Sequence, residues 1–153
     1  MNKIVIVSGS TKGLGLAISK QLVEHGYIVV GVSRFNSNEF SELMSNHSES
    51  VFFHAFDFFN TDKISALVKD IVKMHGRPYA LINNAALGHD GVLATMHEKD
   101  IQDLIKINIE APILLAKYAT RSMLLNRVGR VVNVGSIIGS TGFNGLSVYG
   151  ATK

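Results

Sequence analysis

Short apolar segments alternate along this chain with longer segments in which apolar residues recur every three or four positions. The short segments are rich in β-branched residues and nearly continuously apolar, which is typical of strands covered on both faces of a parallel sheet. Five strands are predicted, at residues 3–7, 27–32, 51–56, 79–82 and 130–134. The alternation therefore predicts an α/β fold with a doubly wound, Rossmann-like parallel sheet of at least five strands.

The longer segments predict four helices between these strands. Their expected bounds are residues 13–25, 38–44, 60 or 61 to 76, and 98–125. Gly26 and Gly76 directly follow two of the apolar stripes, as glycines that end helices do, and Pro78 prevents the third helix from continuing.

Pro112 lies inside the fourth predicted helix. A proline in a helix interior has no N–H to donate and pushes aside the carbonyl group four residues earlier, which here belongs to Asn108. We therefore expect the backbone carbonyl of Asn108 to be free to accept another hydrogen bond.

The composition indicates a globular protein and excludes several kinds of site. With 46% hydrophobic and 18% charged residues and no internal repeat, residues 1–153 fit a single domain. The net charge is +3, but the basic residues are scattered, so no nucleic-acid partner is expected. Cysteine is absent and the six histidines lack metal-binding spacing, which excludes disulfides and thiolate catalysis and predicts no metal site. The first apolar run is too short for a signal peptide or a membrane span, so we expect a cytoplasmic protein without a membrane partner.

A glycine-rich turn directly follows the first predicted strand. Its spacing is G-x-x-x-G-x-G, which fits neither the G-x-G-x-x-G fingerprint nor the G-x-x-x-x-G-K-[ST] loop. Because the turn leads into a helix, the free N–H groups of the first helical turn can bind phosphate. The residues predicted to contact a nucleotide cofactor here are Gly9, Ser10, Thr11, Lys12, Gly13, Leu14 and Gly15. The alternative is a tight turn that needs glycine for backbone reasons and binds nothing.

The end of the second predicted strand carries Ser33 and Arg34. An acidic residue at this point would accept the ribose hydroxyls of NAD, whereas an arginine favours the 2′-phosphate of NADP. Lys12 is either a second cation near that phosphate or an ordinary solvated lysine. NADP(H) is therefore expected in preference to NAD(H).

Five motifs together resemble the short-chain dehydrogenase/reductase family. They are the glycine-rich turn, Asn83-Asn84-Ala85-Ala86 after the fourth strand, Asn108, Ser136 after the fifth strand, and Tyr149-x-x-x-Lys153. Each occurs in the family's order on the expected element, and the resemblance covers the whole chain. It implies an oxidoreductase that transfers a hydride between NADP(H) and a small-molecule carbonyl or alcohol, in a homo-oligomer.

The resemblance also assigns roles to single residues. Tyr149 would give a proton to the substrate carbonyl, and a cation four residues on, Lys153, favours its ionised form. Lys153 and Tyr149 would also contact the cofactor, and Ser136 would hydrogen-bond the carbonyl oxygen. The backbone carbonyl of Asn108 would hold a water in a proton relay, which agrees with the carbonyl that Pro112 should free. Serine hydrolysis through Ser136 is rejected, because the G-x-S-x-G pattern is absent.

Further cofactor contacts follow from the same resemblance. Asp57, expected to end the third strand, would lie near the adenine ring, and residues 83–85 (Asn83, Asn84 and Ala85) would line the cofactor and brace the sheet. Ala86 stands where the family usually has glycine, so a positive backbone angle there would be costly and the loop at 87–96 is expected to differ locally.

The chain ends at Lys153, and the six-stranded order of this fold needs at least one more crossover and strand. We therefore expect an incomplete domain that lacks the family's C-terminal strands. The open apolar edge at 131–134 would promote self-association, and the single turn carrying Tyr149 and Lys153 would be poorly preorganised. A non-catalytic NADP(H)-binding fragment or gene remnant is the alternative function.

Overall fold

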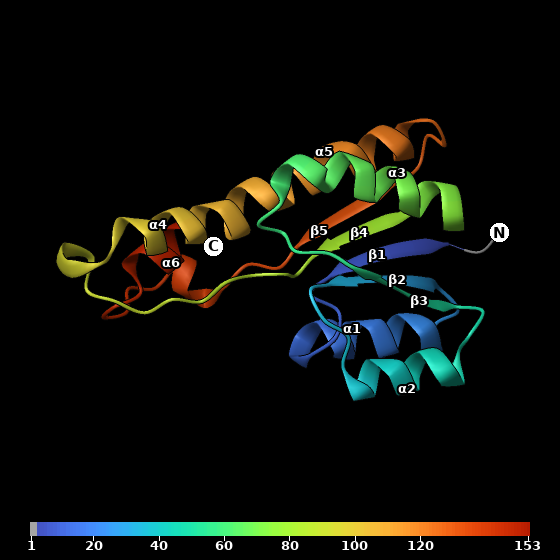
Figure 1. The fold of residues 1–153 in the computed structure, drawn as a ribbon, viewed down its shortest axis with the longest axis horizontal. Helices are drawn as coiled ribbons and strands as arrows, with labels where there is room; N and C mark the ends of the chain where they lie inside the picture. The colour runs from blue at the N-terminus through green and yellow to red at the C-terminus, as the bar shows by residue number, and fades with distance from the viewer. Residues whose placement is uncertain (1–2) are drawn as a thin grey trace.

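The computed structural model describes residues 3–153, and its centre is a five-stranded sheet. The strands are β1 (Ile4–Ser8), β2 (Ile28–Ser33), β3 (Val51–Ala55), β4 (Ala80–Asn83) and β5 (Arg130–Asn133). Their order is β3-β2-β1-β4-β5, and every neighbouring pair is parallel (Figure 1). The doubly wound α/β fold predicted from the alternation is confirmed, with strand bounds that differ by no more than one residue at either end.

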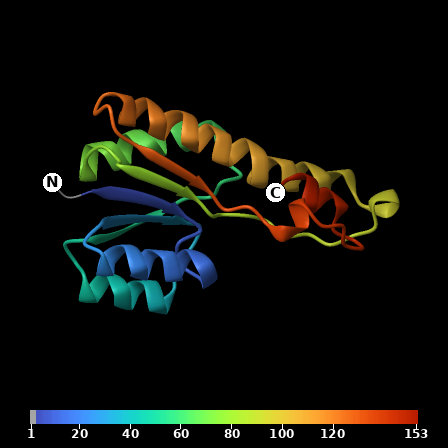
Figure 2. The same cartoon turned by 180° about the vertical axis from the view of Figure 1, so that it is seen from behind.

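Helices cover both faces of this sheet. They are α1 (Gly13–Glu24), α2 (Asn38–Asn46), α3 (Ile64–His75), α4 (Glu98–Ile105), α5 (Ala111–Leu124) and α6 (Ser147–Ala151), with single turns η1 (Thr61–Lys63), η2 (Leu93–Thr95) and η4 (Ile137–Gly139). The helices α1 and α2 lie on one face and α3 and α5 on the other (Figures 1 and 2). The helices α4 and α6 project beyond the carboxyl ends of the strands, next to the expected site.

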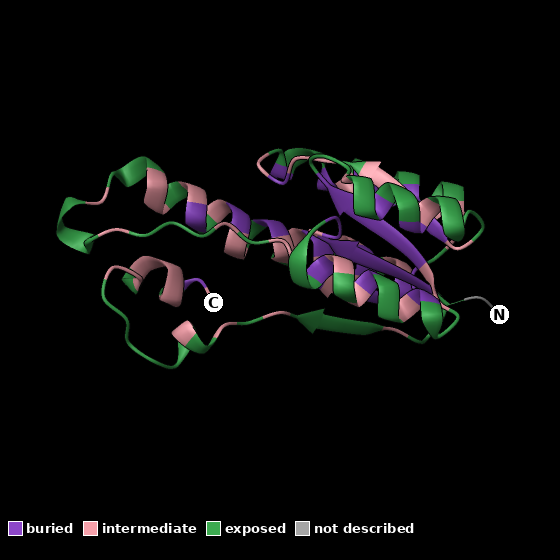
Figure 3. Ribbon diagram, turned by 90° about the horizontal axis from the view of Figure 1, so that it is seen from below, coloured by how far each residue is buried: buried purple, intermediate pink, exposed green. Residues whose placement is uncertain are grey.

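The core consists of two clusters, one on each face of the sheet. Alternate residues of β1 point to opposite faces, so that Ile6 joins the cluster under α3 and α5 while Val7 joins the cluster under α1 and α2. All five residues of β1 are buried, and the central strands form the buried band in Figure 3. Burial on both faces explains why the strands read as continuous apolar runs.

The fourth predicted helix differs from the expectation of one uninterrupted α-helix. It is divided into α4 and α5 by a wider π-helical turn, η3 (Lys106–Glu110), in which the Ala111 N–H donates to the Lys106 carbonyl five residues back. Pro112 falls in the first turn of α5, where a missing N–H costs little. The apolar spacing could not reveal this turn, because it continues through all three segments. Asn108 lies in the centre of η3, and the free backbone carbonyl expected there stays a prediction.

Strand β5 is the exposed edge of the sheet. All four of its residues are solvent-exposed, including Val131 and Val132, and the strand pairs only with β4 (Figure 3). An unpaired strand edge with apolar side chains is a template for pairing with another chain. The self-association expected from the sequence stays a prediction.

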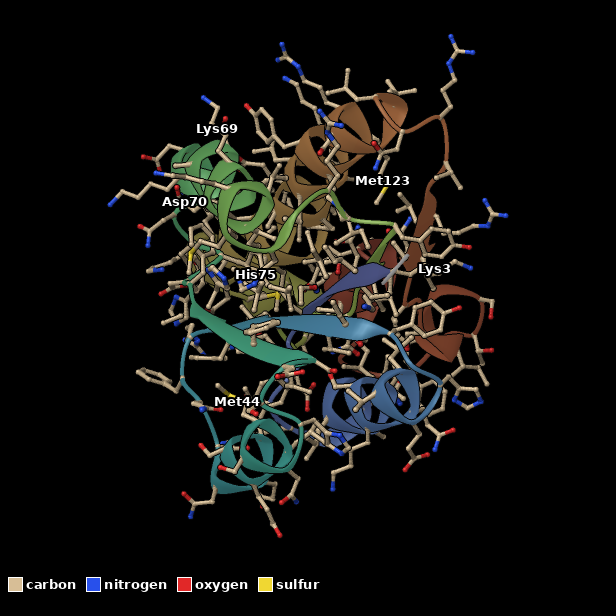
Figure 4. The ribbon with its side chains drawn as sticks, turned by 90° about the vertical axis from the view of Figure 1, so that its right-hand side faces the viewer. Lys3, Met44, Lys69, Asp70, His75 and Met123 are labelled. Carbon is tan, nitrogen blue, oxygen red and sulfur yellow. The ribbon has the colours of Figure 1, made fainter. Side chains whose placement is uncertain are left out.

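A histidine pair joins the opposite edge strand to a helix. His54 on β3 and His75 on α3 lie with their Nε2 atoms 2.9 Å apart and their ring centroids 5.2 Å apart, and Phe52 packs on the His75 ring (Figure 4). One ring must donate its proton and the other accept, so the contact requires at least one neutral imidazole. Burial lowers the pKa of His54, and the negative charge of Asp70 opposes this shift by a smaller amount. Burial also lowers the pKa of His75, and the neighbouring His54 lowers it further.

These lowered pKa values predict that acid destabilises the protein. Below a pH of about 6.5, the unfolded chain binds more protons than the folded chain. The contribution of the histidine pair to the free energy of unfolding is therefore fully present above that pH and is lost as the pH falls through the folded-state pKa values. Thermal unfolding scans between about pH 8 and pH 5 should show the loss. The double variant His54→Gln, His75→Gln should flatten this slope relative to the control His47→Gln, an exposed histidine at the end of α2. Equal slopes in both variants would contradict the assignment.

Candidate functional site

Two neighbouring cavities lie at the carboxyl ends of the parallel strands. In a doubly wound sheet, the order of connections reverses between β1 and β4, and ligands bind outside this point. The first cavity, about 410 Å³, is lined by Gly9, Thr11, Lys12, Ser33, Arg34, Phe35, Asp57, Phe58, Phe59, Asn84, Ala85, Ala86, Leu87 and Ile107. The second, about 370 Å³, is lined by Asn83, Ala85, Asn108, Ile109, Pro112, Ile113, Ala116, Asn133, Val134, Gly135, Thr152 and Lys153. Ala85 belongs to both, so the two cavities adjoin.

The glycine-rich turn is packed tightly against the segment that follows β4. Gly9 has a φ of +67°, and a Cβ atom there would lie 2.9 Å from the Ala85 Cα. A Cβ on Gly15 would lie 2.0 Å from the Gly9 carbonyl oxygen and 2.6 Å from Asn84 Nδ2. Gly13 has a φ of +50° and open space at its Cβ position. Two of the three glycines are therefore required by close packing, and the third by its backbone angle.

The N-terminus of α1 is free to bind an anion. Its N-cap residue, Lys12, makes no capping hydrogen bond through its side chain, and the first turn contains no acidic residue. The first N–H groups of a helix have no partner within the helix, and the helix dipole places partial positive charge there. This end of α1 adjoins the first cavity, which Thr11 and Lys12 line.

Ser8 is a residue of the site that the sequence analysis did not select. Its Oγ accepts hydrogen bonds from the backbone N–H groups of Asn84 and Ala85, both at 3.0 Å, and donates to the Ile82 carbonyl at 3.3 Å. In turn, Asn84 Nδ2 donates two hydrogen bonds, to the carbonyls of Ser8 at 3.0 Å and Gly9 at 3.1 Å. The available signal was a hydroxyl directly after the apolar run predicted to form the first strand, at the position that proves to end β1.

The residues expected to select NADP and the aspartate expected near the adenine ring all line the first cavity. Ser33, Arg34, Lys12 and Asp57 all line it, and the Lys12 and Arg34 side chains are exposed. Asp57 was predicted to end strand β3, but it lies two residues beyond the strand, in a turn. There its Oδ1 accepts the Phe59 N–H at 3.0 Å. The turn explains the shift, because an aspartate that bonds the backbone two residues on favours a turn over a strand.

Five residues predicted to contact the cofactor, Tyr149 among them, line neither cavity. Ser10 is buried with its Oγ 3.5 Å from Ser33 Oγ, and Leu14 is 57% exposed; Gly13 and Gly15 are the other two. Even so, the donor set of the first cavity fits a dinucleotide with an additional phosphate. It combines free N–H groups for a pyrophosphate, two cations for a 2′-phosphate and apolar walls such as Phe58.

Asn108 and Lys153 face the second cavity. Asn108 Oδ1 accepts the Leu87 N–H at 2.8 Å, and its Nδ2 donates to the Leu87 carbonyl and to Thr152 Oγ1, both at 2.9 Å. Lys153 Nζ donates to the Val134 carbonyl at 2.8 Å, and burial lowers the pKa of its amine. Thr152 is a second residue of the site that sequence reasoning missed, although it precedes Lys153 within the Tyr149-x-x-x-Lys153 motif.

Ser136 and Tyr149 are near this cavity in sequence but do not line it. Ser136 begins η4, where its Oγ accepts the Ile138 N–H at 3.3 Å, and Tyr149 is half-buried on α6. Lys153 lies two residues beyond the last residue of α6, not within it. The structure therefore places Asn108 and Lys153 together and leaves Ser136 engaged with its own turn.

Asn83 braces the elements around the second cavity. Its Nδ2 donates to Asn133 Oδ1 at 2.8 Å and to the Pro112 carbonyl at 3.3 Å, which ties β4 to β5 and α5. Its Oδ1 is buried without a partner. Asn133 is a third residue that the sequence analysis did not select, since only the strand pairing brings it opposite Asn83.

The loop after β4 is fixed at three points. Besides the Asn108 bonds to Leu87, the His89 ring lies 3.2 Å from the Asp100 carboxylate, and the Gly91 N–H donates to the Gly145 carbonyl. Ala86 has a negative φ, so no strain arises there.

Residues 3–153 contain no helix that is long and apolar enough to span a membrane and no group of three or more metal-ligating side chains.

Comparison with known proteins agrees with this architecture. Residues 3–153 match the family model described as short chain dehydrogenase. The chain is 31% identical over 153 residues to a 3-oxoacyl-[acyl-carrier-protein] reductase of Vibrio cholerae. The matched region covers 99% of this chain and 62% of that relative. It therefore spans less than two thirds of that relative's length.

Solved structures resemble it as well. A short-chain dehydrogenase from Streptomyces avermitilis has a TM-score of 0.93 at 27% identity, covering 100% of this chain and 56% of that one. A structure described as ElxO with NADP bound has a TM-score of 0.91 at 30% identity, covering 99% of this chain and 62% of that one. Because the family model matches residues 3–153, the chain belongs to the short chain dehydrogenase family.

Proposed function

We propose that this chain is the cofactor-binding part of an NADP(H)-dependent oxidoreductase that interconverts a small-molecule carbonyl and an alcohol. The observation that carries the proposal is the pair of adjoining cavities. One is lined by phosphate-binding groups, including Lys12 and Arg34, and the other by Asn108 and Lys153. A bound dinucleotide would need a site of the first kind, and proton transfer would need groups of the second kind.

The preference for NADP(H) over NAD(H) rests on charge. Arg34 follows β2 directly and Lys12 precedes α1, and both cations line the first cavity, in which the adenosine ribose would lie. A 2′-phosphate adds negative charge that these cations can neutralise, whereas the hydroxyl of NAD offers no such charge. The ElxO structure with NADP bound is a relative in which the family fold holds this cofactor.

In the proposed reaction, the nicotinamide supplies or accepts the hydride, and the chain's side chains handle the proton. Tyr149 donates a proton to the substrate's carbonyl oxygen as negative charge develops there. Ser136 donates a hydrogen bond to the same oxygen through its hydroxyl hydrogen, which the bond accepted from the Ile138 N–H leaves free. Lys153 brings positive charge to the Tyr149 end of α6 and favours the phenolate.

Lys153 and Asn108 are suited to pass protons onward. Burial lowers the pKa of Lys153, so its amine releases a proton more readily than a solvated lysine does. The backbone carbonyl of Asn108 lacks a helical donor at Pro112 and can accept a hydrogen bond in the second cavity, which both residues line.

NADP(H) binding without turnover is the second candidate function. Ser136 Oγ accepts from the Ile138 N–H and Lys153 Nζ donates to the Val134 carbonyl, so each of these two proposed catalytic groups already has a partner in the ligand-free chain. Under this reading, the first cavity functions and the second does not. A single domain, a homo-oligomer and a cytoplasmic location remain predictions under either function.

Thermal unfolding with and without nucleotide tests the proposed cofactor. At about one hundred times its dissociation constant, NADPH should add about 2.7 kcal/mol to the free energy of unfolding, and NADH at the same concentration should add less. Arg34→Leu should reduce the NADPH shift and leave the NADH shift unchanged. The control Arg121→Leu removes an exposed arginine on α5, outside both cavities, and should change neither shift. Equal shifts for the two nucleotides in the wild type would contradict the NADP preference.

A further inference from the structure

Thr152 occupies an unusual place between the proposed catalytic residues. It is 8% exposed and directly precedes Lys153. Its Oγ1 accepts a hydrogen bond from Asn108 Nδ2 at 2.9 Å and donates one to the Tyr149 carbonyl at 2.8 Å. One hydroxyl therefore connects the π-helical turn η3 to the helix that carries Tyr149.

The contacts of Asn108 determine which atom donates and which accepts in each of these hydrogen bonds. Its Oδ1 accepts from the Leu87 N–H, so the two hydrogens on Nδ2 are left for the Leu87 carbonyl and the Thr152 hydroxyl. The hydroxyl has a single hydrogen, which goes to the Tyr149 carbonyl. Without that hydroxyl, one N–H of the half-buried Asn108 amide would lose its acceptor, which costs more than the loss of a fully exposed hydrogen bond.

The helix α6 needs such an anchor because it is short. It comprises Ser147–Ala151, and a helix of one turn is unstable by itself because nucleation costs more than one hydrogen bond returns. Its C-terminal end is fixed through the Thr152 hydroxyl, and Lys153 adds a second attachment through Nζ to the Val134 carbonyl. These two attachments hold the turn that presents Tyr149.

The same hydroxyl is connected to the first cavity. Asn108 binds both backbone groups of Leu87, and Leu87 lines the cavity proposed to hold the cofactor. A displacement of the Asn108 amide would therefore move a wall of that cavity and α6 together.

We propose that Thr152 is a positioning residue whose hydroxyl sets the Asn108 amide and thereby holds Leu87 and the Tyr149 helix in one arrangement. Its role in turnover rests on the proposed function, but its effect on Leu87 does not. The proposal concerns the hydroxyl alone, so serine should replace threonine and valine should not.

The test compares Thr152→Val, Thr152→Ser and the control Thr120→Val in the ligand-free chain. Thr120 is a suitable control because its hydroxyl bonds only within α5, to the carbonyls of Ala116 and Lys117. Amide hydrogen exchange at Leu87, measured by NMR relative to Val29 in the core, should rise about tenfold in T152V, the size expected for one lost hydrogen bond. T152S and T120V should retain wild-type exchange at Leu87. A purely global loss of stability would raise exchange at both reporters equally and would overturn the proposal.

Cofactor binding separates this proposal from the proposed function. If T152V raises Leu87 exchange while the wild type binds no NADPH, the positioning role stands and the proposed function fails. If the wild type binds NADPH and T152V leaves Leu87 exchange unchanged, the positioning role fails alone. Where turnover is measurable, T152V should lower kcat about tenfold and raise the KM for NADPH, because Leu87 lines the cofactor cavity, and T152S should restore both. Should T152V fail to fold, T152C retains a weak donor and acceptor, and its Leu87 exchange must then lie above that of T152S.

Discussion

Replacing Gly15 with alanine is expected to destabilise the fold and abolish NADPH-induced stabilisation. Alanine within a helix is normally more stable than glycine by about 1 kcal/mol, because glycine loses more backbone entropy on folding. Here the Cβ would lie 2.0 Å from the Gly9 carbonyl oxygen, and backbone cannot move aside as a flexible side chain can. Overpacking typically costs about 1–3 kcal/mol, so after the helix preference is subtracted a net loss of up to about 2 kcal/mol remains, which lowers the melting temperature by up to about 8 °C.

The same substitution would disturb binding, because Asn84 holds the turn from the other side. Asn84 Nδ2 bonds the Ser8 and Gly9 carbonyls and would lie 2.6 Å from the added methyl group. The matched control is Gly142→Ala, which adds a methyl group in open space at a residue without a positive φ. Differential scanning calorimetry with and without NADPH measures both effects. A G15A protein as stable as G142A, with a full NADPH shift, would show that the close approach is not needed.

The glycine-rich turn also shows how far sequence reasoning can reach. The spacing predicts where glycine must stand after the first strand, and the continuous apolar runs predict a parallel sheet, because both properties are local in the chain. The arrangement of the turn is not local: Ser8 bonds the backbone of Asn84, 76 residues away, and no periodicity encodes that partner. Ser8 was therefore left out of the predicted site although it fixes two of its strand ends.

The same limit explains Thr152 and Asn133. Their roles arise only when η3 meets α6 and when β5 pairs with β4, so that Thr152 faces Asn108 and Asn133 faces Asn83. The π-helical turn was not predicted from the sequence for a different reason. Its residues keep the apolar spacing of an α-helix, and only the missing N–H of Pro112 marks the place. Asp57 was displaced from the predicted strand by its own bond to the Phe59 N–H.

A Tyr149→Phe variant should lose turnover and keep its cofactor. Removing the phenol removes the proposed proton donor, which should lower kcat by about 10²–10⁴-fold, the usual contribution of a general acid. The ring remains on α6, and the bonds of Thr152 to Asn108 and to the Tyr149 backbone carbonyl do not involve the phenol, so the helix should stay in place. The NADPH-induced shift in melting temperature should therefore match that of the wild type.

Consumption of NADPH with a panel of small carbonyl compounds measures this effect, and Tyr118→Phe serves as the control. Tyr118 lies on α5 beside Lys117, outside both cavities, so its phenol should be dispensable. Wild-type kcat in the Y149F variant would remove Tyr149 from the role of acid. A wild-type chain that binds NADPH and reduces none of the carbonyls would instead favour binding without turnover, in which Ser136 and Lys153 keep their bonds to Ile138 and Val134. The two outcomes are distinct because the first compares variants of an active enzyme, whereas the second needs only the wild type.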